Sequence, residues 1–111
     1  MSTTIAYPEI TVICPYGAIN ASNSVDFQQE MARAIAQNQK SNVLVNLKEV
    51  ESLDSAGLMA LVSSLRLAQT LGSRFSLCGV SPSIRIIFEL TQLDRVFEIF
   101  ENTTAFEKAC S

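Results

Sequence analysis

Strand-like and helix-like segments alternate along this chain, and no other feature constrains its fold as strongly. Ile10, Val12 and Cys14 occupy every second position of an early segment, which predicts a strand. Residues 42–47 form a short run of mostly aliphatic side chains, which is typical of a strand buried on both faces. Helix-like segments separate such runs, and a strand–helix–strand order favours parallel pairing. The alternation therefore predicts an α/β fold.

Apolar residues recur at helical spacing in two long segments. The first segment begins at a cap supplied by Ser22 or Asn23 and ends near Gln39. The second begins at Ser55 and stops at Gly72, because glycine favours the turn that ends a helix. The buried stripes are expected to be Phe27, Met31, Ala34 and Ile35 in the first helix, and Leu58, Leu61, Val62, Leu65 and Ala68 in the second.

Two shorter helices are predicted in the C-terminal part of the chain. Ser81 and Pro82 begin the first of them, since serine caps a helix and proline suits the first helical position. Thr103 or Thr104 can cap the last helix. The stripe of the Ser-Pro helix is expected to be Ile84, Ile87 and Phe88, and the last helix carries Phe106 and Ala109.

The segments between these helices complete the predicted sheet. Pro15 and Gly17 indicate a turn, after which residues 18–20 return briefly to the sheet. Residues 48–54 are expected to form a loop. Further strands are predicted at residues 3–5, 75–78 and 96–100. We therefore predict a mixed, mostly parallel sheet of four to five strands, with about four helices packed against it and right-handed crossovers.

The size and composition suit a single soluble domain spanning residues 1–111. Hydrophobic residues make up 48% of the chain and charged residues 17%, which argues against disorder. No apolar run approaches the roughly 20 residues that cross a bilayer, and the N-terminus lacks the pattern of a secretory signal. We therefore expect a cytoplasmic protein without membrane insertion.

The chain contains no histidine, which excludes Ser-His-Asp and Cys-His catalytic groups and any histidine-bound metal. It also lacks a Gly-rich phosphate loop, so we expect neither an enzyme nor a bound cofactor or metal. The net charge is −3 and the basic residues are scattered, which argues against direct nucleic-acid binding. Cys14, Cys78 and Cys110 are expected to be free structural thiols.

The segment from Leu53 to Leu58 places a serine at the start of an amphipathic helix. The first N–H groups of a helix lack partners within it, and the helix dipole favours negative charge there. The local structure would therefore tolerate a phosphate on Ser55, which adds about −1.5 to −2 charges beside Asp54. Because a docked partner could be repelled by that charge, Ser55 is a candidate phosphoacceptor.

The same residues also have purely structural explanations. Ser55 can serve as a helix cap only, and Asp54 can be the cap itself or a solvated loop carboxylate. Gly57 lies in the first helical turn, where glycine costs about 1 kcal/mol relative to alanine. Its bare backbone either permits close approach by another molecule or relieves crowding against the sheet. The residues alone leave these alternatives open.

Residues 46–58 read Asn-Leu-Lys-Glu-Val-Glu-Ser-Leu-Asp-Ser-Ala-Gly-Leu and resemble the central signature of STAS domains. In that family a strand and a short loop lead into Asp-Ser-Ser/Ala-Gly-Leu and a helix. Residues 17–20, 71–77 and 80–93 resemble three further family segments in order and spacing. The resemblance covers about residues 8–110 and implies a single STAS domain.

The chain looks like the anti-anti-sigma branch of that family, whose members are anti-sigma factor antagonists. The resemblance implies that an anti-sigma factor, which is also a serine protein kinase, binds the unphosphorylated domain and thereby frees a sigma factor. Phosphorylation at the position of Ser55 blocks that binding, and a serine phosphatase restores it. Asp54 matches the acidic residue before the phosphoacceptor, and Ala56 replaces a second serine seen in many members. Ser52 remains a nearby competitor for phosphate.

Helical geometry suggests where such a partner would dock. Met59 and Arg66 lie on the same flank of the second helix as Ser55. Met59 either contacts a partner or fills the edge of the core. Ile86 and Leu90 lie off the stripe of the Ser-Pro helix, and either form an exposed patch or pack beneath the last helix. The expected partner-binding residues are Asp54, Ser55, Ala56, Gly57, Met59 and Arg66.

A second hypothesis keeps the fold and changes the role. STAS domains also serve as regulatory subunits of transporters and as parts of stress-signalling scaffolds. Those roles require a membrane protein or a larger assembly, and the chain itself supplies neither. Co-purification with a transporter would favour this alternative.

Overall fold

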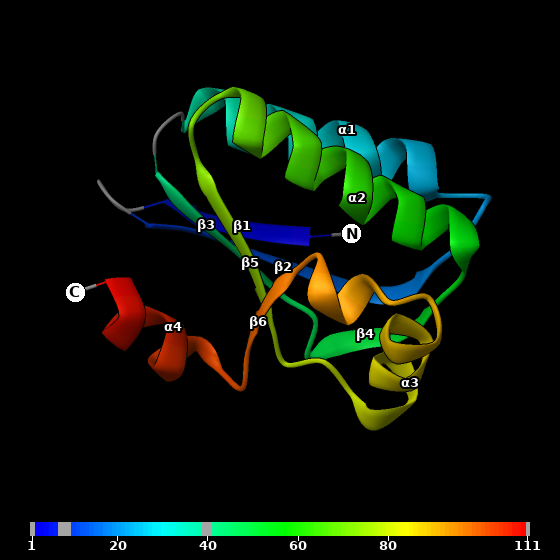
Figure 1. Cartoon of the computed structure of the whole chain (residues 1–111). Helices are drawn as coiled ribbons and strands as arrows, with labels where there is room; N and C mark the ends of the chain where they lie inside the picture. Colours follow the sequence, from blue (N-terminus) through cyan, green and yellow to red (C-terminus); the bar gives the residue numbers. More distant parts are fainter. Residues whose placement is uncertain (1, 7–9, 39–40, 111) are drawn as a thin grey trace.

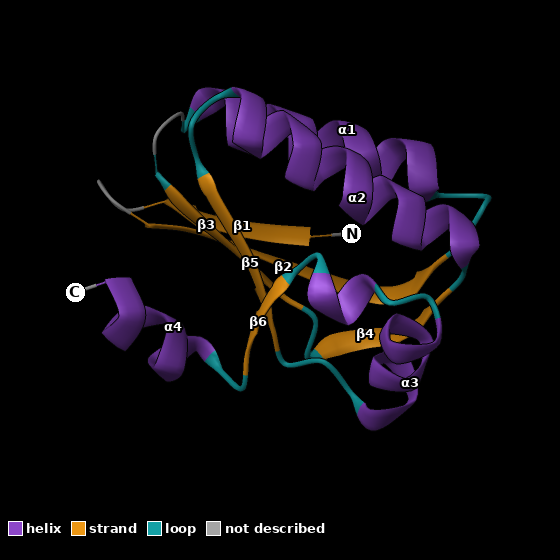
Figure 2. Ribbon diagram, in the orientation of Figure 1, coloured by secondary structure: helices purple, strands orange, loops and turns teal. Residues whose placement is uncertain are grey.

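The computed structural model describes residues 2–6, 10–38 and 41–110 of the chain, and it has the predicted α/β architecture. Apart from an additional strand at residues 49–53, the main strands and helices follow the expected order (Figures 1 and 2). The elements are β1 (Ser2–Ala6), β2 (Ile10–Ile19), α1 (Ser24–Gln37), β3 (Asn42–Asn46), β4 (Glu49–Leu53), α2 (Ser55–Thr70), β5 (Arg74–Cys78), α3 (Pro82–Leu90), the 3-10 helix η1 (Leu93–Arg95), β6 (Glu98–Phe100) and α4 (Thr103–Cys110).

The sheet is mixed and mostly parallel, as predicted. Its strand order is β1-β2-β3-β5-β6, and β4 pairs separately with the second half of β2. The predicted edge strand β1 pairs antiparallel with β2, whereas every other pairing among the described strands is parallel. The helices α1, α2 and α3 supply the crossovers between parallel strands, which is the expected use of helices in such a sheet.

Strand β2 is longer than predicted, because the expected turn at Pro15 and Gly17 lies inside it. Gly17 pairs with Val50 and Ala18 pairs with Ser52, so Glu51 of β4 forms a β-bulge opposite this point of β2. Gly17 has a φ of +80°, which glycine adopts without steric cost. Turn-forming residues thus bend the strand without ending it, since β4 provides a pairing partner on the far side of the bulge.

Strand β4 occupies residues that we expected to form a loop. Val50 and Leu53 are buried, whereas Glu49, Glu51 and Ser52 are exposed. This burial does not alternate strictly, because Glu51 is an extra residue of β4 that has no partner in β2. With three polar residues in five, the segment carries little strand propensity of its own, and its pairing with the end of β2 makes it a strand.

Helices α1 and α2 lie side by side over one face of the sheet (Figure 1). Their predicted stripes are largely buried and pack on Ile13, Val43 and Val45 from β2 and β3. Helix α4 covers the opposite face, where Phe106 packs with Leu44 and Cys78. The core therefore has two layers, and the larger one lies under α1 and α2.

The ends of some elements differ from the predictions by a few residues. Helix α1 ends at Gln37, whereas we predicted an end near Gln39. Residue 39 lies outside the described residues. Strand β6 begins at Glu98 and not at the predicted residue 96, because η1 occupies Leu93–Arg95 and Val96 follows it at the surface. Asn102 caps α4, since its side chain accepts the N–H of Ala105. The three cysteines are free thiols, as expected.

Strands β5 and β6 are joined at the sheet edge by an ion pair. The Arg74 guanidinium donates to both carboxylate oxygens of Glu98 at 2.7 Å, and the Ser76 hydroxyl also donates to Glu98. The guanidinium also lies 5.8 Å from the ring centre of Phe100. The hydrogen bond from Arg74, more than any other contact, lowers the pKa of the Glu98 carboxyl.

Candidate functional site

The junction of β4 and α2 carries the candidate phosphoacceptor. Leu53 is buried at the end of β4, and Asp54 follows in an extended conformation with φ −95° and ψ −174°. Ser55 is then the first residue of α2, and its side chain is exposed. The end of a buried strand thus delivers two polar residues to the surface at the start of a long helix.

Asp54 is the cap of α2. Its Oδ1 accepts the N–H of Gly57 at 3.0 Å, and its carbonyl accepts the N–H of Leu58 at 2.9 Å. Its other carboxylate oxygen, Oδ2, accepts the N–H of Ala21 at 3.1 Å from the connection between β2 and α1. Asp54 therefore satisfies an orphan donor of α2 and also ties a distant segment to the helix start.

Ser55 is not needed as a cap, because Asp54 already has that role. Its hydroxyl makes no hydrogen bond to another described residue. An exposed hydroxyl without an internal partner is available to an enzyme that modifies it. This geometry decides between the two explanations of Asp54 that the residues left open, and it removes capping as a reason for a serine at position 55.

Gly57 is buried, and packing explains why it is glycine. A Cβ atom at this position would lie 2.6 Å from Cδ1 of Leu53 and 3.0 Å from the carbonyl oxygen of Ile19. Both distances are shorter than ordinary contacts, so a larger residue would push the helix start away from the sheet. Relief of crowding is therefore the reason for Gly57, and half-buried Ala56 covers the same turn at the surface.

The predicted flank of α2 lies at the surface beside Ser55. Met59 is 57% exposed, and Arg66 is also exposed two turns farther along the helix. Met59 therefore does not fill the edge of the core. Ile86 and Leu90 of α3 are 56% and 79% exposed, so they do not pack beneath α4. Asp54, Ser55, Met59 and Arg66 thus follow one another along the exposed start and flank of α2.

The turn at residues 20–23 belongs to the same region, which sequence analysis did not indicate. The side chain of Asn20 accepts the backbone N–H and the hydroxyl of Ser22, and the side chain of Asn23 accepts the N–H of Asn20. Figure 1 shows this β2–α1 connection and the start of α2 at the same end of the molecule. Asparagine and serine at this spacing favour such turns, but the contact with Asp54 spans 33 residues of sequence.

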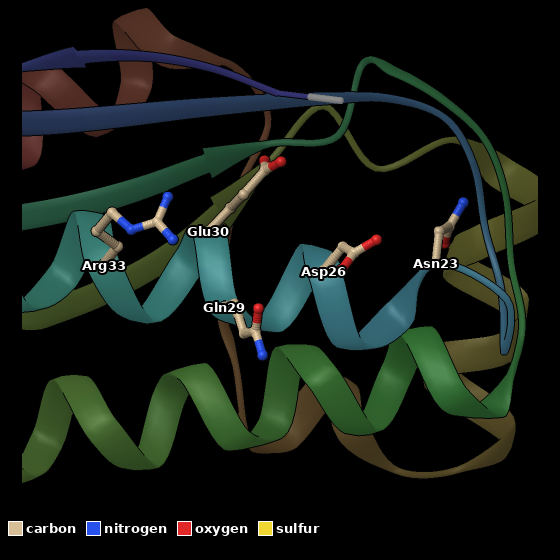
Figure 3. A pocket seen from close by; sticks show the side chains of 5 residues that line it. All are labelled: Asn23, Asp26, Gln29, Glu30 and Arg33. Carbon is tan, nitrogen blue, oxygen red and sulfur yellow. The ribbon is translucent and has the colours of Figure 1, made fainter.

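One pocket in the described part of the chain lies along α1, and Asn23 is the residue that it shares with the turn beside Asp54. Its volume is about 350 Å³, and it is lined by Asn23, Asp26, Gln29, Glu30 and Arg33 (Figure 3). All five residues come from α1 or its cap, as Figure 3 shows. No group of three or more potential metal ligands occurs among the described residues.

Comparison with known proteins identifies the family to which this chain belongs. A model of the STAS domain matches residues 2–105. The chain belongs to the STAS domain family. The anti-sigma F factor antagonist of Paenibacillus polymyxa is 23% identical over 86 residues, which cover 78% of this chain and 74% of that protein. The family predicted from residues 46–58 is thereby confirmed.

Solved structures of STAS proteins have the same fold. An anti-sigma-factor antagonist domain protein from Planctomyces limnophilus superposes with a TM-score of 0.86 at 21% identity, covering 99% of this chain and 97% of that one. SpoIIAA of Bacillus in its phosphorylated form gives 0.72 at 18% identity, covering 98% and 99%. These likenesses establish the α/β architecture of this STAS domain. No helix in the described part of the chain has the length and apolarity to cross a membrane.

Proposed function

We propose that this STAS domain is an anti-sigma factor antagonist whose binding is switched by phosphorylation of Ser55. Unphosphorylated, it binds an anti-sigma factor that is also a serine protein kinase, and a sigma factor is released. Phosphate on Ser55 ends the complex, and a serine phosphatase restores binding. The domain thus regulates transcription indirectly, acts in the cytoplasm, and works by binding without catalysis of its own. The names of its relatives support the antagonist role.

The observation that carries the proposal is the division of roles between Asp54 and Ser55. Asp54 caps α2 with its own carboxylate, while the Ser55 hydroxyl is exposed and makes no bond to a described residue. A kinase can therefore reach the hydroxyl without breaking a contact that the fold needs. Phosphate placed there meets the positive end of the α2 dipole, which stabilises the modified domain.

The proposed docking surface consists of Asp54, Ser55, Ala56, Met59 and Arg66, with Gly57 packed beneath them. Met59 offers an adaptable apolar contact, and Arg66 offers a cation for an acidic group of the partner. Ser55 lies at one end of this surface. Because Ser55 belongs to this surface, a docked partner covers a charge added there, and the charge is screened less than in water.

The added charge is large enough for a switch. A phosphate of charge −2 at ~6 Å from a partner carboxylate costs about 3 kcal/mol at an effective dielectric constant of about 40. That energy corresponds to roughly a hundredfold loss of affinity. The unmodified serine carries no such penalty, so one covalent step changes the fraction of bound partner from high to low.

The test is a mass spectrum of the protein recovered from the cells that make it, during growth and under stress. We expect one phosphate that maps to Ser55. A Ser55→Ala variant should lack it and should remain bound to the partner under both conditions. A Ser52→Ala variant is the matched control, because Ser52 is an exposed serine three residues away, and it should keep the phosphate.

An unmodified Ser55 under both conditions would contradict the proposal. It would favour the other role open to this fold, as a regulatory subunit of a transporter or a component of a stress-signalling scaffold. In that case the protein that co-purifies with the domain identifies the role.

A further inference from the structure

We propose that Asp54 is a positioning residue that transmits the phosphorylation state of Ser55 to the turn at Asn20–Ser22. The inference rests on the proposed function only for the presence of phosphate on Ser55. It adds a second place where a partner can distinguish the two states of the domain, outside the serine and the flank of α2.

The two oxygens of the Asp54 carboxylate hold two separate parts of the chain. Oδ1 accepts the N–H of Gly57 at 3.0 Å inside α2, and Oδ2 accepts the N–H of Ala21 at 3.1 Å, 33 residues earlier in the sequence. Asp54 is exposed, so its carboxylate can rotate without disturbing the core. One side chain therefore links the start of α2 to the β2–α1 connection.

Ala21 depends on Asp54 in a way that its neighbours do not. The N–H groups of Asn20 and Ser22 bond to side-chain oxygens of Asn23 and Asn20, within the turn itself. The N–H groups of Asn23 and Ser24 bond to the carbonyl of Asn20. The Ala21 N–H instead bonds to the Asp54 carboxylate. Movement of that carboxylate would free one amide in a turn that is otherwise closed on itself.

Phosphate on Ser55 supplies the force for such a movement. It places about −1.5 to −2 charges on the residue next to Asp54, and like charges repel. Its oxygens also compete for the N–H groups of the first turn of α2, including the Gly57 N–H that Asp54 now binds. Displaced from Gly57 and repelled by the phosphate, the carboxylate turns away, and Ala21 loses its acceptor. Ala21 and Ser22 are exposed, so a partner can detect the change.

The experiment compares the full chain carrying serine or genetically encoded phosphoserine at position 55, by NMR measurement of backbone amide exchange and chemical shift. We expect the Ala21 amide to exchange on the order of tenfold faster in the phosphorylated protein, since one hydrogen bond is lost. The amide of Asn20 is the internal control, because its acceptor is Asn23, and its exchange should stay the same. An unchanged or slower exchange at Ala21 would overturn the inference.

An Asp54→Ser variant tests whether Asp54 is the link. Serine can still cap Gly57, but its short side chain does not reach Ala21. The Ala21 amide should exchange fast in this variant, with or without phosphate. If phosphate still altered Ala21 exchange in the variant, Asp54 would not be the link. If the variant does not fold, an unchanged Ala21 exchange in the native sequence still overturns the inference. Because the phosphoserine is installed directly, the result does not depend on whether cells phosphorylate Ser55.

Discussion

At the scale of single residues, the helix start shows how three neighbouring positions take three different roles. The Asp54 carboxylate accepts two backbone N–H groups, and the Ser55 hydroxyl bonds to no described residue. Gly57 lets the start of the helix pack closely against the sheet. Each role follows from the contacts that the residue makes or leaves open. Substitutions only a few residues apart should therefore have very different effects on stability and on signalling.

Replacing Gly57 with alanine should destabilise the fold. The new Cβ would lie 2.6 Å from Leu53 and 3.0 Å from the Ile19 carbonyl oxygen, so the helix start must shift. The gain in helix propensity of about 1 kcal/mol is smaller than the cost of overpacking, and we expect a net loss of about 1–2 kcal/mol. Denaturation in guanidinium chloride measures this change in the free energy of unfolding. Ser55→Ala, in the same turn but exposed, should change the free energy of unfolding by less than about 0.5 kcal/mol.

At the scale of elements, α3 has one buried side and one exposed side. Phe88 is fully buried and stacks on Phe97 with ring centres 5.8 Å apart, while Ile86 and Leu90 face solvent. The side that packs on the core is the predicted stripe of Ile84, Ile87 and Phe88. The sequence left open only whether Ile86 and Leu90 on the other side are covered.

A pair of substitutions two residues apart checks the orientation of α3. Phe88→Ala should cost about 3–5 kcal/mol, because it removes a buried ring and leaves a cavity. Leu90→Ala should cost less than about 0.5 kcal/mol, because 79% of that residue is exposed. Urea denaturation of both variants is the measurement. A large loss at Leu90 would mean that the outer side of α3 is covered in the protein.

The ion pair between β5 and β6 makes part of the stability dependent on pH. The pKa of Glu98 is lowered in the folded state, chiefly by the hydrogen bond from Arg74, so its ionised form favours folding. That contribution is complete above the ordinary carboxyl range, from about pH 5 upward, and is lost as the pH falls through the lowered folded-state value.

A Glu98→Gln variant should therefore be less stable than the native sequence at pH 7, and the difference should shrink as the solution is acidified. Chemical denaturation at a series of pH values measures the difference. Glu107→Gln, at an exposed position of α4, is the control for loss of a carboxylate at the surface. A difference that stayed constant down to pH 3 would show that the ion pair is not its source.

At the scale of the whole molecule, one sheet joins two layers of packing. Helices α1 and α2 cover one face and α4 covers the other, and β3 and β5 contribute side chains to both. The Cα radius of gyration is 12.6 Å, which suits one compact domain of this length. The two layers share the same strands, so neither can unfold without disturbing the other.

We therefore predict that the chain unfolds in a single cooperative transition. Far-UV circular dichroism reports the helices, and tyrosine fluorescence reports the surroundings of residues such as Tyr16 on β2. The two signals should give the same midpoint in urea. Separate midpoints would indicate that one part of the domain unfolds independently of the rest.

Local pattern was sufficient for much of this protein. The helical spacing around Phe27 and Leu61 and the aliphatic run at Val43–Val45 predicted the elements and the α/β class, because burial of one stripe or strand imposes a period on the sequence. The Asp-Ser-Ala-Gly order indicated the candidate site and the family. The identity of Ser55 as candidate phosphoacceptor needed no coordinates.

Tertiary structure decided what depends on segments that are distant in sequence. The polar segment at Glu49–Leu53 became a strand because the far end of β2 pairs with it, and the turn residues at Gly17 stayed inside β2 for the same reason. The choice of Asp54 as cap, its bond to Ala21, the crowding at Gly57 and the exposure of Met59 likewise depend on neighbours that local periodicity does not specify. Local spacing determines which residues can be buried, whereas the packing of distant segments determines which of them are.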